Sequence, residues 1–148
     1  MRTLWKSMKA GPRSENGGRG VWKVGEWRKH DGKLSMCGAG YHASRNVIDA
    51  MNYVDAEVIA QVEVRGKHLK QDDKECWSEM RIVRAWKWMK ADSVSLAIYA
   101  AELVIGIFEK RYPDDKRPRL AIEAAKAWLK DPSEENRQAA GAAAWAAA

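Results

Sequence analysis

The chain has 148 residues, a net charge of +6 and 46% hydrophobic residues, a size and composition that suit one compact unit with a core of its own. Two cysteines and no apolar run near 18 residues argue against a disulfide scaffold, a zinc site and a membrane span. The first residues also lack the apolar stretch of a secretory signal, so we expect a cytoplasmic protein without a bound metal.

The basic residues are concentrated in the first part of the chain. Residues 1–90 contain 18 Lys and Arg against 11 Asp and Glu, and they hold six of the eight Trp. Residues 91–148 are slightly acidic and rich in alanine. This shift predicts a basic, Trp- and Gly-rich β lobe over residues 1–90, with an Ala-rich helical region over residues 91–148 packed on it. The expected fold class is therefore α+β.

Short strands separated by loops are predicted for the β lobe. Residues 2–8 fit a strand, and the polar, Gly-rich residues 11–20 fit a loop. Asp31-Gly32 is typical of a hairpin turn, which predicts strands over residues 21–28 and 34–36.

Ser44 is expected to cap a helix with one apolar face, which contains Val47, Ile48, Met51 and Val54. Residues 58–65 then alternate in polarity as a strand does. A turn at residues 71–74 and a last strand at residues 78–86 complete the β lobe.

Helices are predicted from Asp92 onward. Asp92 is expected to cap a helix that ends near Tyr112-Pro113, because proline disfavours helix in the residue before it. Pro118 fits the first turn of a second helix. The residues expected to be buried between these helices are Leu103, Ile107, Ile122 and Trp128.

Asp131 is expected to cap a third helix, with Pro132 in its first turn. Residues 139–148 form an Ala-rich stretch with neither glycine nor proline after it. We therefore expect that the chain is truncated there, or that the small-residue face packs against a partner.

The segment Cys37-Gly-Ala-Gly-Tyr-His-Ala-Ser44 carries the most specific functional signal. Its glycines admit a positive φ or a close approach of backbone or ligand, and Tyr41 and His42 add a stacking face with a polar tip. This combination is typical of a ligand-holding turn. A Gly-rich turn that leads into a strand would produce the same pattern.

Together with this segment, three further motifs resemble the successive strands of the ADP-ribosyltransferase fold, in its poly-ADP-ribose-polymerase-like branch. These motifs are Leu4-Trp5-Lys6-Ser7, residues 58–66 and residues 78–83, in the order of that family. The resemblance spans residues 3–86 and implies a small split β-sheet with a pocket for NAD. Lys6 stands where the family usually has a histidine.

The resemblance also implies which residues hold NAD and which one acts on it. The cofactor-binding residues would be Lys6, Tyr41, His42, Ser44 and Tyr53. Glu79 would be the catalytic carboxylate, since transfer from NAD needs a negative charge near the cationic ribose. Alternatively, Glu79 is a surface carboxylate paired with Arg81 or Lys74, and His42 is a half-buried polar tip. The resemblance leaves open whether the transferase is active or degenerate.

The helical region carries a second resemblance. Residues 96–129, with Tyr112-Pro-Asp-Asp-Lys-Arg-Pro-Arg119 at their centre, resemble an Ala-rich helical module of phage and bacterial immunity proteins. The two resemblances together imply a phage-type protein, which would work in the cytoplasm of its host.

An alternative function follows from tryptophans that stand beside cations, a mixture typical of nucleic-acid grooves. The predicted binding face consists of Trp22, Lys23, Trp27, Arg28 and Lys87. Core tryptophans with a solvated basic rim would produce the same pattern. The alternative to the transferase is therefore a non-enzymatic inhibitor or anti-defence protein that binds a bacterial host protein, a protein–nucleic acid complex or nucleic acid.

Overall fold

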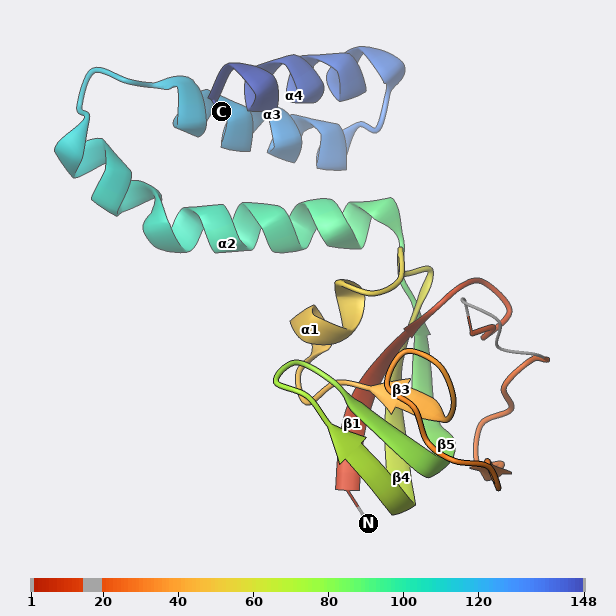
Figure 1. The fold of residues 1–148 in the computed structure, drawn as a ribbon. Helices are drawn as coiled ribbons and strands as arrows, with labels where there is room; N and C mark the ends of the chain where they lie inside the picture. Colours follow the sequence, from red (N-terminus) through yellow and green to blue (C-terminus); the bar gives the residue numbers. More distant parts are fainter. Residues whose placement is uncertain (1, 15–19, 148) are drawn as a thin grey trace. The chain divides into compact units, whose positions relative to one another are not determined.

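The computed structural model describes residues 2–14 and 20–147, so residues 15–19 of the loop predicted at residues 11–20 lie outside the described residues. The chain divides into two compact units, residues 1–88 and residues 89–148, each with its own core. The first unit, called the β unit here, is built on an antiparallel sheet, and the second, the helical unit, on three helices (Figure 1). The α+β class is confirmed.

The sheet of the β unit has five strands. They are β1 (Arg2–Met8), β2 (Arg28–Lys29), β3 (Tyr41–Ala43), β4 (Val58–Lys70) and β5 (Glu75–Lys87). The strand order is β1-β4-β5-β2, and β3 also pairs with β5. Every pairing between these strands is antiparallel. The first strand is confirmed, and both β4 and β5 are longer than predicted.

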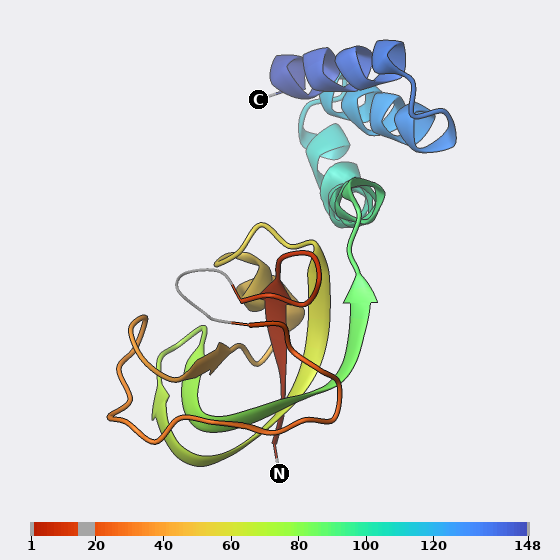
Figure 2. The same ribbon diagram turned by 90° about the vertical axis from the view of Figure 1, so that its right-hand side faces the viewer.

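The sheet curls until its paired strands form a closed circuit. Ser44, directly after β3, exchanges two backbone hydrogen bonds of 2.8 Å with Trp5 of β1. β3 pairs in turn with β5, with Tyr41 opposite Trp77. The circuit therefore runs from β1 through β4, β5 and β3 back to β1, and Figure 2 shows how strongly β4 and β5 bend to allow it. This closure places Lys6 beside the segment that contains Tyr41.

Alternating side chains of the three long strands form the core of the β unit. Leu4 lies opposite Val62 across β1 and β4, and Val62 lies opposite Ile82 across β4 and β5. All three side chains are fully buried. Burial of each aliphatic side chain stabilises the fold by roughly 1.5–3 kcal/mol, so this row of contacts joins the long strands.

The hairpin predicted around Asp31-Gly32 does not form. Among the described residues 21–36, the strand β2 pairs with β5, with Arg28 opposite Met80, and the amide of His30 donates to the carbonyl of Ser78 at 2.8 Å. The backbone groups that a local hairpin would need are thus hydrogen-bonded to the edge of β5. The prediction was wrong because a longer neighbouring strand outcompeted the local turn.

Helix α1 (Val47–Met51) is shorter than predicted and has a different cap. The side chain of Asn46, not Ser44, accepts a hydrogen bond of 2.8 Å from the amide of Asp49. The backbone of Ser44 is already committed to pairing with Trp5. Helix α1 lies against β1.

The helical unit contains α2 (Lys90–Arg111), α3 (Arg117–Lys130) and α4 (Glu134–Ala147). Its core is formed by Ile98, Ile105 and Ile122. Ile122 is buried as predicted, whereas Leu103 and Ile107 are 66% and 72% exposed, which contradicts the prediction. At 3.6 residues per turn, Leu103 and Ile107 lie on the far side of α2 from Ile98. Trp128, also predicted to be buried, is half-buried.

Two helix starts differ from the prediction. Helix α2 begins after Met89, whose amide donates to the carboxylate of Asp92 at 2.7 Å, so Asp92 lies in the first turn and not at the cap. Helix α4 begins after Ser133, whose hydroxyl accepts from the amide of Asn136 at 3.3 Å. The predicted cap, Asp131, ends α3 instead. Helix α3 starts with a proline in its first turn, as predicted.

Helix α2 is the one helix among the described residues that is long and apolar enough, by length and composition alone, to cross a membrane. It carries Glu102, which forms an ion pair with Lys126 of α3. Its Ile98 and Ile105 pack within the helical unit. A single helix of this kind is a weak indication of a membrane span.

Candidate ligand-binding site

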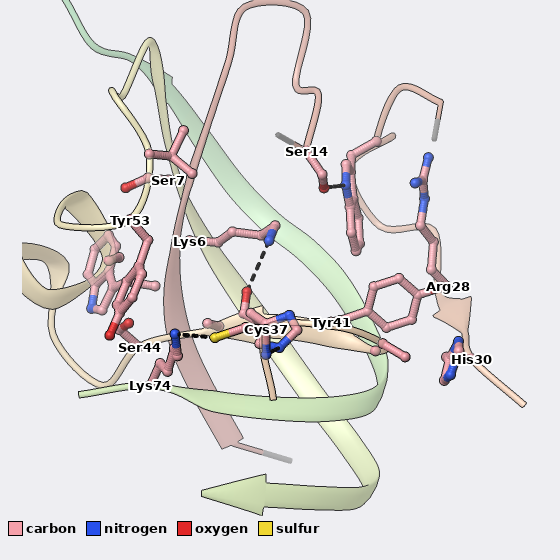
Figure 3. A pocket seen from close by; sticks show the side chains of 18 of the residues that line it. Lys6, Ser7, Ser14, Arg28, His30, Cys37, Tyr41, Ser44, Tyr53 and Lys74 are labelled. Carbon is pink, nitrogen blue, oxygen red and sulfur yellow. Dashed lines mark hydrogen bonds between the residues drawn. The ribbon is translucent and has the colours of Figure 1, made fainter. Parts of the chain in front are cut away.

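A cavity of about 830 Å³ lies in the β unit beside the Gly-rich segment. Its walls come from β1, β3, residues 37–40, α1 and the turn between β4 and β5, and also from Arg28 and His30 (Figure 3). The structure brings all five predicted cofactor-binding residues together in its lining, namely Lys6, Tyr41, His42, Ser44 and Tyr53. These residues come from separate parts of the chain and meet because the strand circuit closes.

Gly40 is what allows the segment to fold against β5. Its φ is +109°, in a region that residues with side chains rarely adopt. A Cβ at this position would lie 2.6 Å from Sγ of Cys76 and 2.7 Å from a methyl carbon of Leu34. The glycine therefore serves both purposes expected of it, the unusual φ and the close approach. The following residues, Tyr41 and His42, are thereby held at the cavity wall.

The lining is positively charged. Lys6, Arg28 and Lys74 contribute cations, and the described lining residues include no Asp or Glu. Aromatic rings make up much of the remaining wall and belong to Trp5, Trp22, Tyr41 and Tyr53. Cations in a partly enclosed site interact with an anion more strongly than they do in bulk water. The cavity is thus suited to a ligand that combines negative charge with a flat ring.

Lys6 extends from β1 toward β3, and its Nζ donates to the carbonyl oxygen of His42 at 3.0 Å (Figure 3). Burial lowers the pKa of Lys6 from its ordinary 10.5 to about 8, and the neighbouring Cys76 offsets only a small part of this effect. The ammonium has three N–H donors, of which this bond uses one. Lys6 can therefore donate to a ligand as well.

His42 holds the Gly-rich segment in place. Its Nε2 accepts a hydrogen bond of 3.0 Å from the amide of Cys37. Burial, together with the positive charges of Lys6 and Lys74, lowers the pKa of His42. The ring is therefore neutral at pH 7, and an acceptor at Nε2 requires the proton to be at Nδ1.

Lys74, at the end of the β4–β5 turn, joins two walls of the cavity. Its Nζ lies 2.9 Å from Sγ of Cys37 and 3.9 Å from the centre of the Tyr53 ring. The hydrogen bond to Cys37 raises the pKa of Lys74, so this side chain is charged at neutral pH. The hydroxyl of Tyr53 donates to Asp73. One face of Tyr53 is therefore covered by a cation.

Two buried polar atoms in the lining have no hydrogen-bond partner among the described residues. They are Oγ of Ser7 and Nε2 of His30. Ser7 is only 5% exposed. A buried polar group that lacks a partner costs about 1–3 kcal/mol, so such atoms commonly mark the place of a ligand or a water molecule.

Glu79 does not line this cavity. Its carboxylate accepts a hydrogen bond of 2.8 Å from Nε of Arg65, and the guanidinium of Arg65 lies 4.0 Å from the centre of the Trp27 ring. Arg81, one of the two expected partners of Glu79, donates to Glu63 at 2.8 Å instead. Glu79 thus belongs to a ladder of charged pairs between β4 and β5.

The residues of the predicted basic binding face do not form one exposed surface. Trp22 is 3% exposed, donates from Nε1 to the hydroxyl of Ser14 at 2.8 Å and meets Tyr41 edge to face at 5.3 Å. Arg28 lies 4.4 Å from the centre of the Trp22 ring, at the cavity. Trp22 is therefore a core residue that also faces the cavity.

The remaining members of that face lie elsewhere. Lys23 is exposed, and Trp27 is half-buried beneath the guanidinium of Arg65. Lys87 is exposed at the end of β5, seven residues beyond Met80, which pairs with Arg28. At roughly 3.3 Å per residue, about 23 Å of strand separates these positions.

The sequence interpretation did not single out Lys74 or Ser7 for the site. Lys74 stands in a turn, and only the pairing of β3 with β5 brings it to Cys37. Ser7 follows Lys6 directly in β1, and this adjacency could have indicated that Ser7 also belongs to the site.

Two family models match the chain. Residues 87–148 match a model described as an Imm-5 like putative immunity protein, which supports the resemblance of the helical region to immunity proteins. Neither match is to an ADP-ribosyltransferase. No curated protein and no solved structure matches the chain. Residues 4–93, which include nearly the whole β unit, match a model described as a domain of unknown function (DUF7666), and the chain therefore belongs to this family.

Proposed function

We propose that the protein is a non-enzymatic binding protein of the immunity type, whose β unit holds an anionic, ring-bearing ligand of the nucleotide class. The observation that carries this proposal is the cavity lining, with three cations, four aromatic residues and, among its described residues, no carboxylate. The volume of about 830 Å³ lies within the usual range of small-molecule sites.

Phosphate is the anion that the cations suit best. Lys6 and Lys74 are buried or half-buried, so their charges are poorly screened by water. Arg28 adds a guanidinium, whose N–H groups match phosphate oxygens. The unpartnered hydroxyl of Ser7 provides a further polar group for the ligand. NAD and ADP-ribose combine phosphates with flat rings and are natural probes.

Binding is favoured over transfer from NAD. Transfer needs a carboxylate near the ribose to stabilise the developing positive charge. Glu79, the expected carboxylate, is bound to Arg65 and does not line the cavity. A site that holds a nucleotide without cleaving it requires only the cations and rings.

The helical unit is the part that we expect to bind another protein, a bacterial host protein if the chain is phage-encoded. Its match to an immunity-protein model supports a protein partner. Tyr99, Leu103 and Ile107 stand four residues apart on α2, so they share one side of the helix, and each is at least 62% exposed. Exposed apolar groups of this kind are typical of protein interaction sites.

Titration with NAD, ADP-ribose and AMP tests the ligand, with tryptophan fluorescence as the signal because Trp5 and Trp22 line the cavity. We expect saturable binding that weakens as salt is added. Lys6→Met should weaken binding by about tenfold or more, since a hydrogen bond to a charged group is worth roughly 1.5–3 kcal/mol. Lys67→Met is the matched control, because Lys67 is exposed on β4 and does not line the cavity.

The same samples separate binding from catalysis. NAD should remain intact over hours with the wild-type protein, and Glu79→Gln should bind as the wild type does. Failure of all three nucleotides to bind would reject the ligand class. Hydrolysis of NAD that Glu79→Gln abolishes would reject the non-enzymatic proposal and favour the transferase.

A further inference from the structure

Lys6 occupies a position that packing alone would give to an apolar residue. In β1, alternate residues share one face, and the neighbours of Lys6 on that face, Leu4 and Met8, are both fully buried. The residue opposite Lys6 on β4 is Ala60, which is also fully buried and small enough to leave room for a long side chain. A lysine in such a row is unfavourable for folding. A residue that costs stability in this way is typical of a functional site, so we consider what the amine could bind.

The surroundings of the Lys6 amine leave it available for reaction. One N–H donates to the carbonyl oxygen of His42, and the described lining residues include no carboxylate to hold the group as an ion pair. With a pKa of about 8, roughly a tenth of the Lys6 side chains are neutral at pH 7. A surface lysine of ordinary pKa is neutral in fewer than about one case in a thousand. Lysines whose pKa is lowered by desolvation serve as nucleophiles in proteins.

We propose that Lys6 captures the carbonyl group of a phosphorylated aldehyde or ketone as a reversible imine, which deepens and rests on the ligand site proposed above. The lone pair of the neutral Nζ attacks the carbonyl carbon, and the electron pair of the C=O bond moves to oxygen, which receives one of the two Nζ protons by way of water. The resulting carbinolamine loses its hydroxyl group and one nitrogen proton as water, which leaves a C=N bond. Amine and carbonyl thus give imine and water, with no change in oxidation state.

The rest of the cavity supports this ligand class. Lys74 and Arg28 line the cavity on opposite sides of Lys6 (Figure 3), so either cation can bind the phosphate while the Lys6 amine meets the carbonyl carbon. The ring of Tyr41 provides a flat wall beside them. Figure 3 shows the Lys6 amine turned toward β3, where a dashed line marks its hydrogen bond to the carbonyl oxygen of His42.

Pyridoxal 5′-phosphate is the probe, because it combines a flat ring, a phosphate and an aldehyde. The whole chain is mixed with one equivalent of the probe at pH 7, reduced with borohydride, digested and mapped by mass spectrometry. We expect Lys6 to carry at least about tenfold more adduct than any other lysine, given its roughly hundredfold larger neutral fraction. Lys6→Arg keeps a positive charge and should abolish the dominant adduct, whereas Lys67→Arg should not. The proposal would be overturned by the wild-type result alone if the adduct were spread evenly over the exposed lysines.

A second probe separates this inference from the proposed function. Pyridoxamine 5′-phosphate has the same ring and phosphate but no carbonyl, so its binding reports the anion site alone. If it binds and Lys6 is still unlabelled by the aldehyde, the reactive amine is refuted and the anion site stands. If it does not bind and Lys6 is labelled selectively, the anion site is refuted and the reactive amine stands.

Discussion

Replacement of Lys6 by methionine should make the folded protein more stable at neutral pH, even though it removes a hydrogen bond. Lys6 lies in a buried row between Leu4 and Met8, where a methionine has the same length and no charge to desolvate. The hydrogen bond from Nζ to the carbonyl of His42 is the interaction that the variant loses.

The magnitude follows from the pKa of Lys6, which burial lowers from 10.5 to about 8. At about 1.4 kcal/mol for each pKa unit, the charged form destabilises the folded state by about 3 kcal/mol. Loss of the hydrogen bond to His42 destabilises the variant by about 1 kcal/mol and so offsets part of this gain. At pH 7 we therefore expect Lys6→Met to raise the free energy of unfolding by about 2 kcal/mol.

The pH dependence gives a sharper test than the size of the effect. Between about pH 8 and 10.5, Lys6 binds fewer protons in the folded state than in the unfolded state, so the wild type should become more stable as pH rises through this window. Lys6→Met cannot show this gain. Urea unfolding of both proteins at pH 7, 8, 9 and 10 measures the difference, and other titrating groups cancel between them. The reasoning would be refuted if the difference in the free energy of unfolding between the two proteins stayed constant from pH 7 to 10. It would also be refuted if the variant were less stable than the wild type at pH 7.

Three further predictions concern packing and the buried carboxylate. Glu75 is fully buried and accepts from Arg45, so Glu75→Gln should destabilise the protein by roughly 3 kcal/mol at pH 7 in urea unfolding. Although burial by itself raises the pKa of Glu75, hydrogen bonds outweigh it and lower that pKa, so the stabilisation should be lost as pH falls through the folded-state value. Ile122→Ala should cost roughly 2–5 kcal/mol, while Ile107→Ala, at a 72% exposed site, should change stability by less than about 0.5 kcal/mol. Gly40→Ala should cost at least about 1 kcal/mol by thermal melting, because its Cβ would clash with Cys76.

Each of these predictions has a contrary outcome. Equal acid unfolding curves for wild type and Glu75→Gln would mean that this carboxylate is not held by its partners. Equal losses for the two isoleucine variants would mean that the far side of α2 is covered. A neutral Gly40→Ala would mean that the Gly-rich segment can move away from β5.

Local patterns in the sequence determined the elements whose signals are short-range. Alternation in polarity was enough to predict β4, in which Val58, Ala60, Val62 and Val64 enter the core. A proline in the first turn marked the start of α3. The Gly-rich segment was predicted to need unusual backbone, and the φ of Gly40 agrees.

The composition of the cavity depended on contacts far apart in the sequence. Lys6 and Lys74 reach one cavity because β3 pairs with β5 and Ser44 pairs with Trp5, and no local pattern encodes these registers. Ser44 does not cap α1, because its backbone N–H and carbonyl are both hydrogen-bonded to Trp5.

Pairing with the long strands β4 and β5, and packing of the helices, decided the features that local patterns left open. Residues Arg28 and Lys29 pair with the edge of β5 instead of forming the hairpin that Asp31-Gly32 favours. The pairing of β4 with β5 places Glu79 beside Arg65, which donates a hydrogen bond to it. On α2, the side that meets Ile122 was decided by packing, because the helix is apolar on more than one side and its periodicity alone selects none. Residue identity thus set the local conformations, while register and packing, which depend on the whole chain, decided which side chains share a site.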